Sequence, residues 1–501
     1  MALRINFNAE AAVTHTALLQ NERAMNKSLL RISTGNRILS AADDAAGLFI
    51  ADQLSVVAAA LQQGNRNIQT GISALQIAET NVGQIFDKLK TIYTKAQSAA
   101  NDINDPNARA ALQRDISNLV DAIQKLGTDT EYNGIKLLDG TFSDKVIHYG
   151  ARADQTITVG INSVKANDLG AYMVVGKFVA QSSTNDYATL TSNTGNFGFD
   201  SANDKAIVNG IDVSTGLTVV DAKTIADNIN NSKALQNAGI SARATNMSTA
   251  SAVWTDIQSG TSESATIKFF VGTSATSAIE INIGANSTLS LSDLVTAINS
   301  KASEKGVNIS ARAENNKLVL VTQGETIGVE VKNDTGQPIN LGQFLNVSAT
   351  VANSATGSAI QVGKLVIMGT NNYNYDFSGI SDTSEGLGIS ATGISTMKNL
   401  YSLDVTNNEN AELALDIVKT ALQRVDTIRT QIGSVINNLQ AIWDGQKASF
   451  DNTKEAENVI RNTDFAEEMS TFTTMQIRMQ AGMAMLAQAN ALPQLVLQLL
   501  R

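Results

Sequence analysis

Few residues in this chain are of the types that perform catalysis or bind metals. The 501 residues include no cysteine and only two histidines, His15 and His148. The lack of cysteine excludes disulfides, thiolate metal sites and cysteine nucleophiles. Two histidines far apart in sequence argue against a histidine-rich metal site, and a serine–histidine–aspartate set would need one of them. No HExxH or GxSxG motif is present either. We therefore predict no enzymatic activity, no catalytic residue, no cofactor and no metal.

Two local patterns look like chemical sites and have simpler explanations. Asp43 and Asp44 are adjacent carboxylates, but the residues around them supply no third type of metal ligand. A helix cap, or an ion pair with another domain or another subunit, explains them better. Gly170 to Lys177 resembles a phosphate-binding loop, but its spacer is one residue too long and Phe178 follows the lysine where Ser or Thr is needed. We expect no phosphate site there.

Composition indicates slender helical packing. The chain has 37 basic and 47 acidic residues and a net charge of −10, which argues against nucleic acid as a partner. Aromatic residues make up only 5%, and there are only three prolines, so long helices can run unbroken. The first ten residues contain no signal-peptide core, and no later run approaches about 18 apolar residues. We expect no ordinary signal peptide and no membrane insertion.

Apolar residues recur at spacings of three and four in three long segments. They run from Leu54 to Ala99, from Leu112 to Leu126 after a loop at 101–106, and from Leu415 to Ile442. This spacing predicts amphipathic helices. Since each helix has an apolar stripe to bury, we expect helices from both halves of the chain to pack in one bundle, with a small β-element near residues 133–163.

The two ends of the chain carry narrower apolar stripes. Residues 1–40 hold five basic and two acidic side chains, and residues 455–501 hold three basic and five acidic ones, so opposite net charges favour their pairing. Stripes this narrow bury little apolar area, and we expect both ends to be largely disordered in the free monomer. The stripe residues are Leu18, Met25, Leu29, Ile32, Leu39, Phe465, Met469, Phe472, Met479, Met483 and Leu486.

The middle of the chain is rich in Ser, Thr, Asn and Gly, with alternating runs such as Lys317–Val321, which predicts a β-rich insertion. It contains a repeat: Ile240–Ala244 recurs as Ile309–Ala313, and Ile229-Asn230 recurs as Ile298-Asn299, all at an offset of 69. We interpret the repeat as a helix-plus-strand unit present twice, at about 206–246 and 279–321.

The predicted fold class is therefore mixed: a long α-helical coiled-coil or bundle core built from both chain ends, with a β-rich (α+β) outer domain inserted into it. We predict three parts: terminal helices at 1–42 and 455–501, a helical bundle at 43–175 and 400–454, and the outer domain at 176–399.

Motifs at both ends of the chain are similar to those of one family. They include RISTGNRI at Arg31–Ile38, AADDAAG at Ala41–Gly47, YNGIKLL at Tyr132–Leu138 and NVIRNTDFAEE at Asn458–Glu468; shorter matches lie at Asn26–Leu29, Gln480–Gly482, Leu486–Asn490 and Pro493–Arg501. The chain thereby resembles bacterial flagellin. This resemblance implies a secreted structural protein that polymerises into the extracellular filament of the bacterial flagellum, serves motility, leaves the cell by type III flagellar export and has termini that fold during self-assembly. In such a filament the terminal stripes would be the self-assembly surface, and Asp43 and Asp44 would lie at inter-domain or intersubunit contacts.

The resemblance also implies partners. A flagellar export chaperone is expected on the C-terminal segment that holds Phe465, Met469, Phe472, Met475, Met479 and Met483, although methionines at this spacing also serve as adaptable core filler. Filament cap and hook-junction proteins are expected neighbours. A Toll-like innate immune receptor contacts some flagellins at positions equivalent to Asp87, Lys88 and Ile92, and the differences here predict weak or absent recognition.

Two alternative functions remain from the sequence. A hook–filament junction protein would share the terminal helices, and the outer domain would suit an adhesin displayed on the filament, since its Ser/Thr/Asn-rich surface fits glycan contact, glycosylation or simple solubility equally well.

Overall fold

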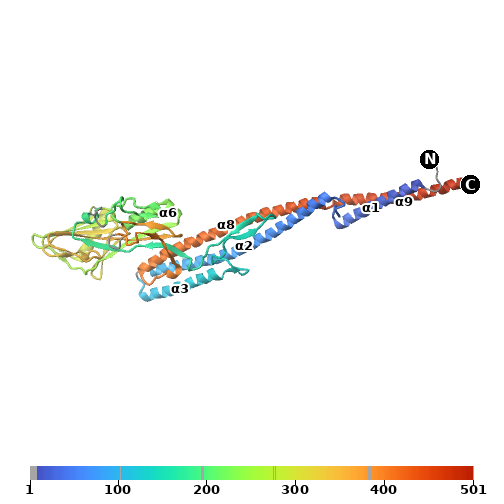
Figure 1. Ribbon diagram of the computed structural model, residues 1–501. Coiled ribbons are helices and arrows are strands. Elements are labelled where there is room, and N and C mark those ends of the chain that lie inside the picture. The colour runs from blue at the N-terminus through green and yellow to red at the C-terminus, as the bar shows by residue number, and fades with distance from the viewer. Residues whose placement is uncertain are drawn as a thin grey trace. The chain divides into compact units, whose positions relative to one another are not determined.

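The computed structural model describes residues 8–101, 103–192, 197–274, 276, 278–381 and 386–499, with the backbone alone for 492–499. The chain divides into two compact units, one formed by residues 1–79, 142–161 and 431–501 and the other by residues 80–141 and 162–430. Figure 1 shows the elements of both. The predicted fold class is confirmed: helices from both chain ends pack together, and a β-rich insertion lies between them in the sequence.

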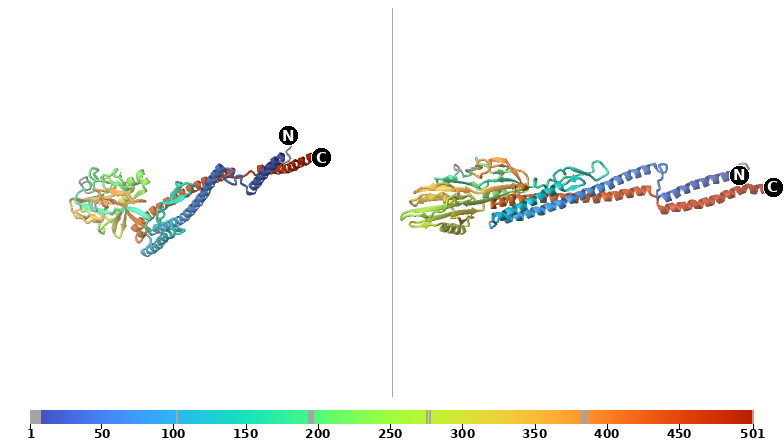
Figure 2. Two further views of the ribbon diagram at one scale, coloured as in Figure 1. Left: turned by 45° about the vertical axis from the view of Figure 1, so that its right-hand side comes forward. Right: turned by 90° about the horizontal axis from the view of Figure 1, so that it is seen from below.

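The first unit is built from helices and one hairpin. It contains α1 (Ala9–Thr34), the start of α2 (Ala45–Ala99), the end of α8 (Asn408–Arg461) and α9 (Phe465–Leu499). The hairpin of β3 (Lys145–His148) and β4 (Thr156–Val159) lies on α2. Helices α1 and α9 run side by side in every view (Figures 1 and 2).

Two glycines of α2 let this hairpin approach the helix closely. A Cβ built on Gly64 would lie 1.9 Å from the Tyr149 carbonyl oxygen, and one on Gly71 would lie 2.5 Å from Ile147 Cδ1. The glycines are seven residues apart, so they share one face of the helix. Asn67, between them, donates from Nδ2 to the His148 carbonyl at 2.9 Å. The hairpin therefore lies so close to α2 that a larger residue at either glycine would clash with it, and the Asn67 side chain binds it there.

The helix ends follow local signals. Asn8 caps α1 by accepting a hydrogen bond from the Ala11 N–H, and Gly35, at φ +72°, ends the helix in the left-handed conformation that glycine favours. Helix α3 (Pro106–Asp129) starts after its cap Asp105, with proline at its first position. Helix α8 continues past residue 454 to Arg461, so the break between the bundle and the C-terminal helix lies at 462–464, later than the boundary at 455 used above.

The helices of the second unit bury the predicted stripes. Ile85, Leu89 and Ile92 of α2 are fully buried, as are Ile123 of α3 and Val425 of α8. Arg429 of α8 lies over the Phe86 ring of α2, 5.4 Å from its centre. Strands β1 (Glu131–Tyr132) and β2 (Ile135–Lys136) form a short hairpin through a positive-φ Asn133-Gly134 turn.

The inserted domain contains two large antiparallel sheets. One has the strand order β14-β15-β9-β20-β5-β23 and the other β12-β11-β16-β19-β6. The first comprises Ser310–Glu314, Lys317–Thr322, Ile240–Thr249, Lys364–Gly369, Gly170–Val175 and Thr396–Asn399, and the second comprises Ile279–Ile283, Ser264–Val271, Ile327–Asp334, Ala355–Val362 and Val179–Ser183. A four-stranded sheet, in the order β22-β21-β7-β8, comprises Thr392–Ile394, Asn374–Asp376, Ile207–Val208 and Ile211–Asp212.

Strand β5 lies next to one of the expected boundaries. The sequence analysis placed residues 170–175 with the bundle, but β5 pairs with β20 and β23 inside the six-stranded sheet. Its residues form a nearly continuous buried run rather than an alternating one, and such a run does not show from sequence which domain it belongs to.

The remaining strands form two short pairs, β10 (Ile257–Gln258) with β13 (Thr288–Leu289) and β17 (Ile339–Asn340) with β18 (Thr350–Val351). Helices α4 (Tyr187–Leu190), α5 (Ala222–Asn231), α6 (Lys233–Asn237) and α7 (Leu291–Lys305), with one 3₁₀ turn at Leu341–Gln343, complete this domain, and a second 3₁₀ turn at Leu400–Ser402 precedes α8. Two apolar clusters fill the domain, one containing Tyr187, Phe197 and Phe377 and the other Phe269 and Phe344.

Helix α2 is long and apolar enough to cross a membrane, judged by its length and composition alone. It contains an 18-residue window with mean hydropathy 1.5, of which 17% is buried, and no other helix in the described part of the chain qualifies. A helix that packs on other helices satisfies the same test, so length and composition alone are weak evidence for a span.

Candidate self-assembly site

The α1·α9 hairpin brings the two chain ends together along one seam. The half-buried or buried residues of α9 recur at alternating spacings of four and three, as in an antiparallel coiled coil. Leu18 of α1 packs over Gly482 of α9, where a Cβ would lie 3.1 Å from Leu18 Cδ1. Near the other end of the seam, Ser28 Oγ donates to the Glu468 carbonyl at 3.3 Å. The α9 seam residues are Glu468, Phe472, Met475, Met479, Gly482, Leu486 and Ala489.

The predicted self-assembly residues separate into two groups. Those that are half-buried are Leu18, Met25, Ile32, Leu39, Phe472, Met479 and Leu486. Those that point away from the seam and are exposed are Leu29, Phe465, Met469 and Met483. The prediction treated them as one stripe, whereas the structure half-buries the first group and leaves 38–58% of each side chain of the second group exposed.

Further exposed apolar residues were missed by the sequence analysis. They are Val13, Leu19 and Leu30 on α1 and Ile477 and Met485 on α9. The search for one stripe per helix overlooked them because they lie off the stripe. The signal that identifies them is the distribution of apolar residues all around α9, which a helix packed on a single partner does not need.

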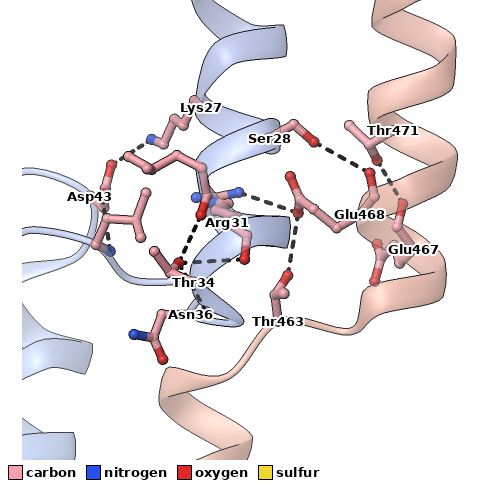
Figure 3. Close-up of polar contacts among 12 residues, drawn as sticks. Lys27, Ser28, Arg31, Thr34, Asn36, Asp43, Thr463, Glu467, Glu468 and Thr471 are labelled. Atoms are coloured by element: carbon pink, nitrogen blue, oxygen red, sulfur yellow. Dashed lines mark hydrogen bonds and ion pairs between the residues drawn. The ribbon is translucent and has the colours of Figure 1, made fainter.

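A polar joint connects the two places where the helices break (Figure 3). The Thr463 N–H donates to the Gly35 carbonyl at 3.0 Å, and the Arg37 N–H donates to the Arg461 carbonyl at 2.7 Å. Asn36 and Asn462 form an isolated antiparallel bridge. The connection after α1 and the connection before α9 are therefore hydrogen-bonded to each other as a minimal β-ladder.

Glu468 gathers the polar contacts on the α9 side of this joint. Its Oε2 lies 3.7 Å from Arg31 Nη1 and accepts from Thr463 Oγ1 at 3.4 Å. Glu468 also lies in the first turn of α9, where a negative charge is favoured by the helix dipole. Figure 3 shows Arg31 and Glu468 facing each other from the two helices.

Asp43 and Asp44 have different roles. Asp43 Oδ1 lies 2.5 Å from Lys27 Nζ, and Oδ2 accepts from the N–H groups of Leu39 and Ser40 at 3.2 Å each. The hydrogen bond from Lys27, assisted by these N–H groups, lowers the pKa of the Asp43 carboxyl below its usual value. Asp44 Oδ1 accepts from the Gly47 N–H at 2.8 Å at the start of α2. Asp43 thus ties α1 to the connection that follows it, and Asp44 caps α2.

The other singled-out positions lie outside this site. In α2, Asp87 is exposed and Lys88 half-buried, whereas Ile92 is fully buried. The side chain of Ile92 thus fills the helical core, and of the three positions expected at a receptor surface only Asp87 and Lys88 reach solvent. His15 and His148 are both exposed, and Gly170–Val175 is a strand rather than a phosphate loop. Within the described residues, no three His, Asp or Glu side chains are grouped so as to hold a metal.

Comparison with known proteins identifies the family. The chain matches the family descriptions "Bacterial flagellin N-terminal helical region" at residues 5–143, "Bacterial flagellin C-terminal helical region" at 415–500 and "Flagellin hook IN motif" at 266–324. It is 56% identical to a flagellin of Aquifex pyrophilus and 51% identical to a flagellin of Aquifex aeolicus, with 100% of each chain covered. Among solved structures, FliC from Burkholderia pseudomallei matches over 74% of this chain and 99% of its own, at 15% identity and a TM-score of 0.30. With matching helical regions at both ends and full-length identity above one half, this chain belongs to the bacterial flagellins, the non-enzymatic structural subunits of the extracellular flagellar filament that serves motility.

Proposed function

We propose that the α1·α9 hairpin is the surface through which this flagellin polymerises, and that its helices become fully ordered only when neighbouring subunits cover them. The observation that carries the proposal is how little the hairpin buries by itself. Among its described side chains, only Ser28 and Ala489 are buried. Fixing the backbone costs about 1–2 kcal/mol per residue, which this seam offsets poorly without further contacts.

The exposed apolar residues supply those further contacts. Val13, Leu29, Ile477 and Met485 are each at least half exposed and lie on both helices of the hairpin. An apolar surface of this kind is rarely left uncovered in a soluble monomer. In the filament, copies of the same hairpin cover it, so that burial in the polymer supplies the free energy that orders each new subunit.

A three-part division of the chain follows from this assignment. The terminal helices, predicted at 1–42 and 455–501, form the assembling part; residues 1–7, 500 and 501 lie outside the described residues. Residues 43–175 and 400–454 form the bundle, and residues 176–399 the solvent-facing domain. The helix break at 462–464 and strand β5 support small shifts of two boundaries.

An export chaperone would compete with α1 for α9. Phe472, Met475 and Met479 lie in the α1 seam, while Phe465, Met469 and Met483 are exposed. A partner that takes both faces can bind only when α1 is absent from the seam. We therefore propose that the chaperone holds α9 before the hairpin forms, and that filament cap and hook-junction proteins meet the hairpin afterwards.

An innate immune receptor is proposed as a weak partner. Of the three predicted positions, Asp87 and Lys88 remain accessible and Ile92 does not. We expect little or no response in a reporter-cell titration with purified monomer, and a response at low monomer concentration would contradict this expectation. The alternative of a junction protein is disfavoured by the full-length identity to flagellins.

Two isoleucines with equal exposure test the assembly surface. Ile477 on α9 and Ile394 on β22 are both 61% exposed. Burying an isoleucine side chain contributes about 1.5–3 kcal/mol, so Ile477→Ser should raise the critical concentration for growth from filament seeds by about tenfold or more, measured by sedimentation and electron microscopy. Ile394→Ser is the matched control and should leave it unchanged.

Amide exchange completes the test of ordering. The amides of α1 and α9 should exchange rapidly in the monomer and become protected in the seeded filament. Equal protection in both states, or equal effects of Ile477→Ser and Ile394→Ser on growth, would contradict the proposal.

A further inference from the structure

The two copies of the repeated segment share one fold from helix cap to strand. Helix α5 precedes β9, with the short helix α6 between them, and the single longer helix α7 precedes β14. The caps Asp221 and Ser290 lie 69 residues apart, and each accepts a hydrogen bond from the N–H three residues later. In the body of each helix, Ile229 and Ile298 occupy equivalent positions and are fully buried. The repeat in sequence therefore corresponds to a repeat in structure.

The asparagine after each buried isoleucine forms two hydrogen bonds with the backbone of the strand that follows its helix. Asn230 donates from Nδ2 to the Ala242 carbonyl at 2.7 Å, and its Oδ1 accepts from the Ala242 N–H at 2.9 Å. Asn299 makes the same pair of bonds with Ala311, both at 2.8 Å. Each side-chain amide thus satisfies both backbone groups of one residue, as a residue of a neighbouring strand would.

The two residues that these asparagines bind, Ala242 and Ala311, each lie where their strand is paired on one side only. β14 is the outermost strand of the six-stranded sheet, and Ala311 faces Leu320 of β15 across the ladder. In β9, Ala242 faces Ile367 of β20, while the ladder with β15 on the other side spans only Asn246–Thr249. Because Ala242 and Ala311 direct both backbone groups to an asparagine, these groups point away from the paired strand, toward the open edge.

An open strand edge is a template for pairing with another chain. We propose that Asn230 and Asn299 close these two edges of the inserted domain, and that their removal allows the edges to pair with the same edges of a second copy of this chain. The preceding isoleucine fixes the helix in the core, and the asparagine then reaches the strand. The proposal assigns a role to Ile298-Asn299, which lies inside the matched motif at 266–324, and to the equivalent pair Ile229-Asn230.

Alanine at these positions removes the amide without disturbing the helix. Alanine has the highest helix propensity, so Asn299→Ala should keep α7 intact. Ser300→Ala is the matched control, because Ser300 is the next residue and is exposed. In dilute full-length protein, the Ala311 amide of Asn299→Ala should exchange about tenfold faster than in wild type, with the Ser300→Ala variant unchanged. Asn230→Ala should act in the same way at Ala242, with the exposed Asn231→Ala as its control.

The second measurement follows exchange as the concentration of monomer is raised. In Asn299→Ala, protection should return at residues 310–314 as edges pair between copies, whereas polymerisation through the terminal helices would protect α1 and α9 instead. Asn299→Asp keeps the acceptor for the Ala311 N–H but loses the donor to the Ala311 carbonyl, so its Ala311 amide should also exchange faster than in wild type. Its protection should not return at high concentration, because its charge opposes strand pairing.

Three results would overturn the proposal. Unchanged exchange at Ala311 in Asn299→Ala would show that the amide does not protect this edge. Faster exchange throughout the inserted domain would make Asn299 a general stabilising residue. Absence of returning protection at 310–314 at high concentration would show that an open edge does not pair.

Discussion

The terminal hairpin and the inserted β domain of this flagellin differ in how far they bury their own apolar side chains. The β domain has two internal cores with fully buried aromatic side chains, including Tyr187, Phe197, Phe269, Phe344 and Phe377. The hairpin has a seam of half-buried side chains, and large apolar residues such as Ile477 and Met485 are exposed outside it. The same 501-residue chain therefore contains one region that buries its apolar side chains itself and another that leaves many of them exposed, where we propose that copies of the chain cover them.

This difference shows that composition alone does not distinguish a core from an interface. α9 is the more apolar region, yet it buries less than the Ser- and Thr-rich β domain. The two regions differ in how their elements pack. Two sheets with covering helices enclose a core on several sides, whereas two helices bury side chains only along one seam. Substitutions in the two regions should accordingly affect different measurements.

The largest expected effect is a loss of β-domain stability on truncating Phe344. This ring is fully buried and packs edge-on against Trp254 at 5.6 Å and Phe269 at 6.4 Å. Phe344→Ala should lower the free energy of unfolding of the β domain by about 3–5 kcal/mol. Urea unfolding followed by Trp254 fluorescence, in a Trp443→Phe background, measures it.

The matched variant in the other region is Phe472→Ala. Phe472 is half-buried in the α1·α9 seam, so its truncation should leave the urea midpoint of the β domain unchanged and reduce seeded filament growth. If Phe344→Ala and Phe472→Ala lowered the same midpoint equally, the two regions would not be independent in stability.

A smaller effect is expected from crowding the hairpin seam. A Cβ at Gly482 would already lie 3.1 Å from Leu18 Cδ1, so Gly482→Leu should force α1 and α9 apart at a cost of about 1–3 kcal/mol. Filaments of this variant should dissociate at lower temperature, measured by light scattering on heating.

Gly445 in α8 is the control for this substitution. A Cβ there meets nothing within 4 Å, so Gly445→Leu should leave the dissociation temperature of the filament unchanged or raise it, since leucine favours a helix over glycine. A lower dissociation temperature for both variants would indicate an effect on the helices rather than on the seam.

The helical part of the fold was predictable from sequence because its signal is local and periodic. Ile85, Leu89 and Ile92 recur at spacings of three and four and are buried as that pattern requires. Strand β5 was expected with the bundle, but its pairing partners, β20 and β23, lie about two hundred residues away in sequence. Short-range pattern does not encode such pairings.

The stripe pattern in the sequence indicated some residues of the candidate self-assembly site and not others. The stripe search identified Leu18, Phe472 and Met479, but it did not identify Ile477 and Met485, which are more than half exposed. It also treated Ile92 as a surface residue on the strength of a resemblance, although its place in the apolar stripe already indicated burial. The hydrogen bonds of Asn230 and Asn299 with the following strands were not predictable from sequence, because a repeat shows only that two residues recur and not which groups they bind.

The smallest expected effect concerns Asp43 and tests whether the polar joint, rather than the apolar seam, makes the hairpin sensitive to acid. Lys27 and the backbone N–H groups of Leu39 and Ser40 hold the pKa of Asp43 below its usual value. A lowered pKa in the folded state stabilises that state above the unfolded-state pKa, and this stabilisation is lost as the pH falls through the folded-state pKa. Filaments of wild type should therefore dissociate at a higher temperature than filaments of Asp43→Asn at pH 7, and the difference should shrink to nothing in acid below the ordinary aspartate range. Because the site is open to solvent, 1 M salt should also reduce the difference. If the difference between wild type and Asp43→Asn stayed constant from neutral pH into acid, Asp43 would contribute through its shape rather than its charge. The polar joint would then be as insensitive to pH as the apolar seam.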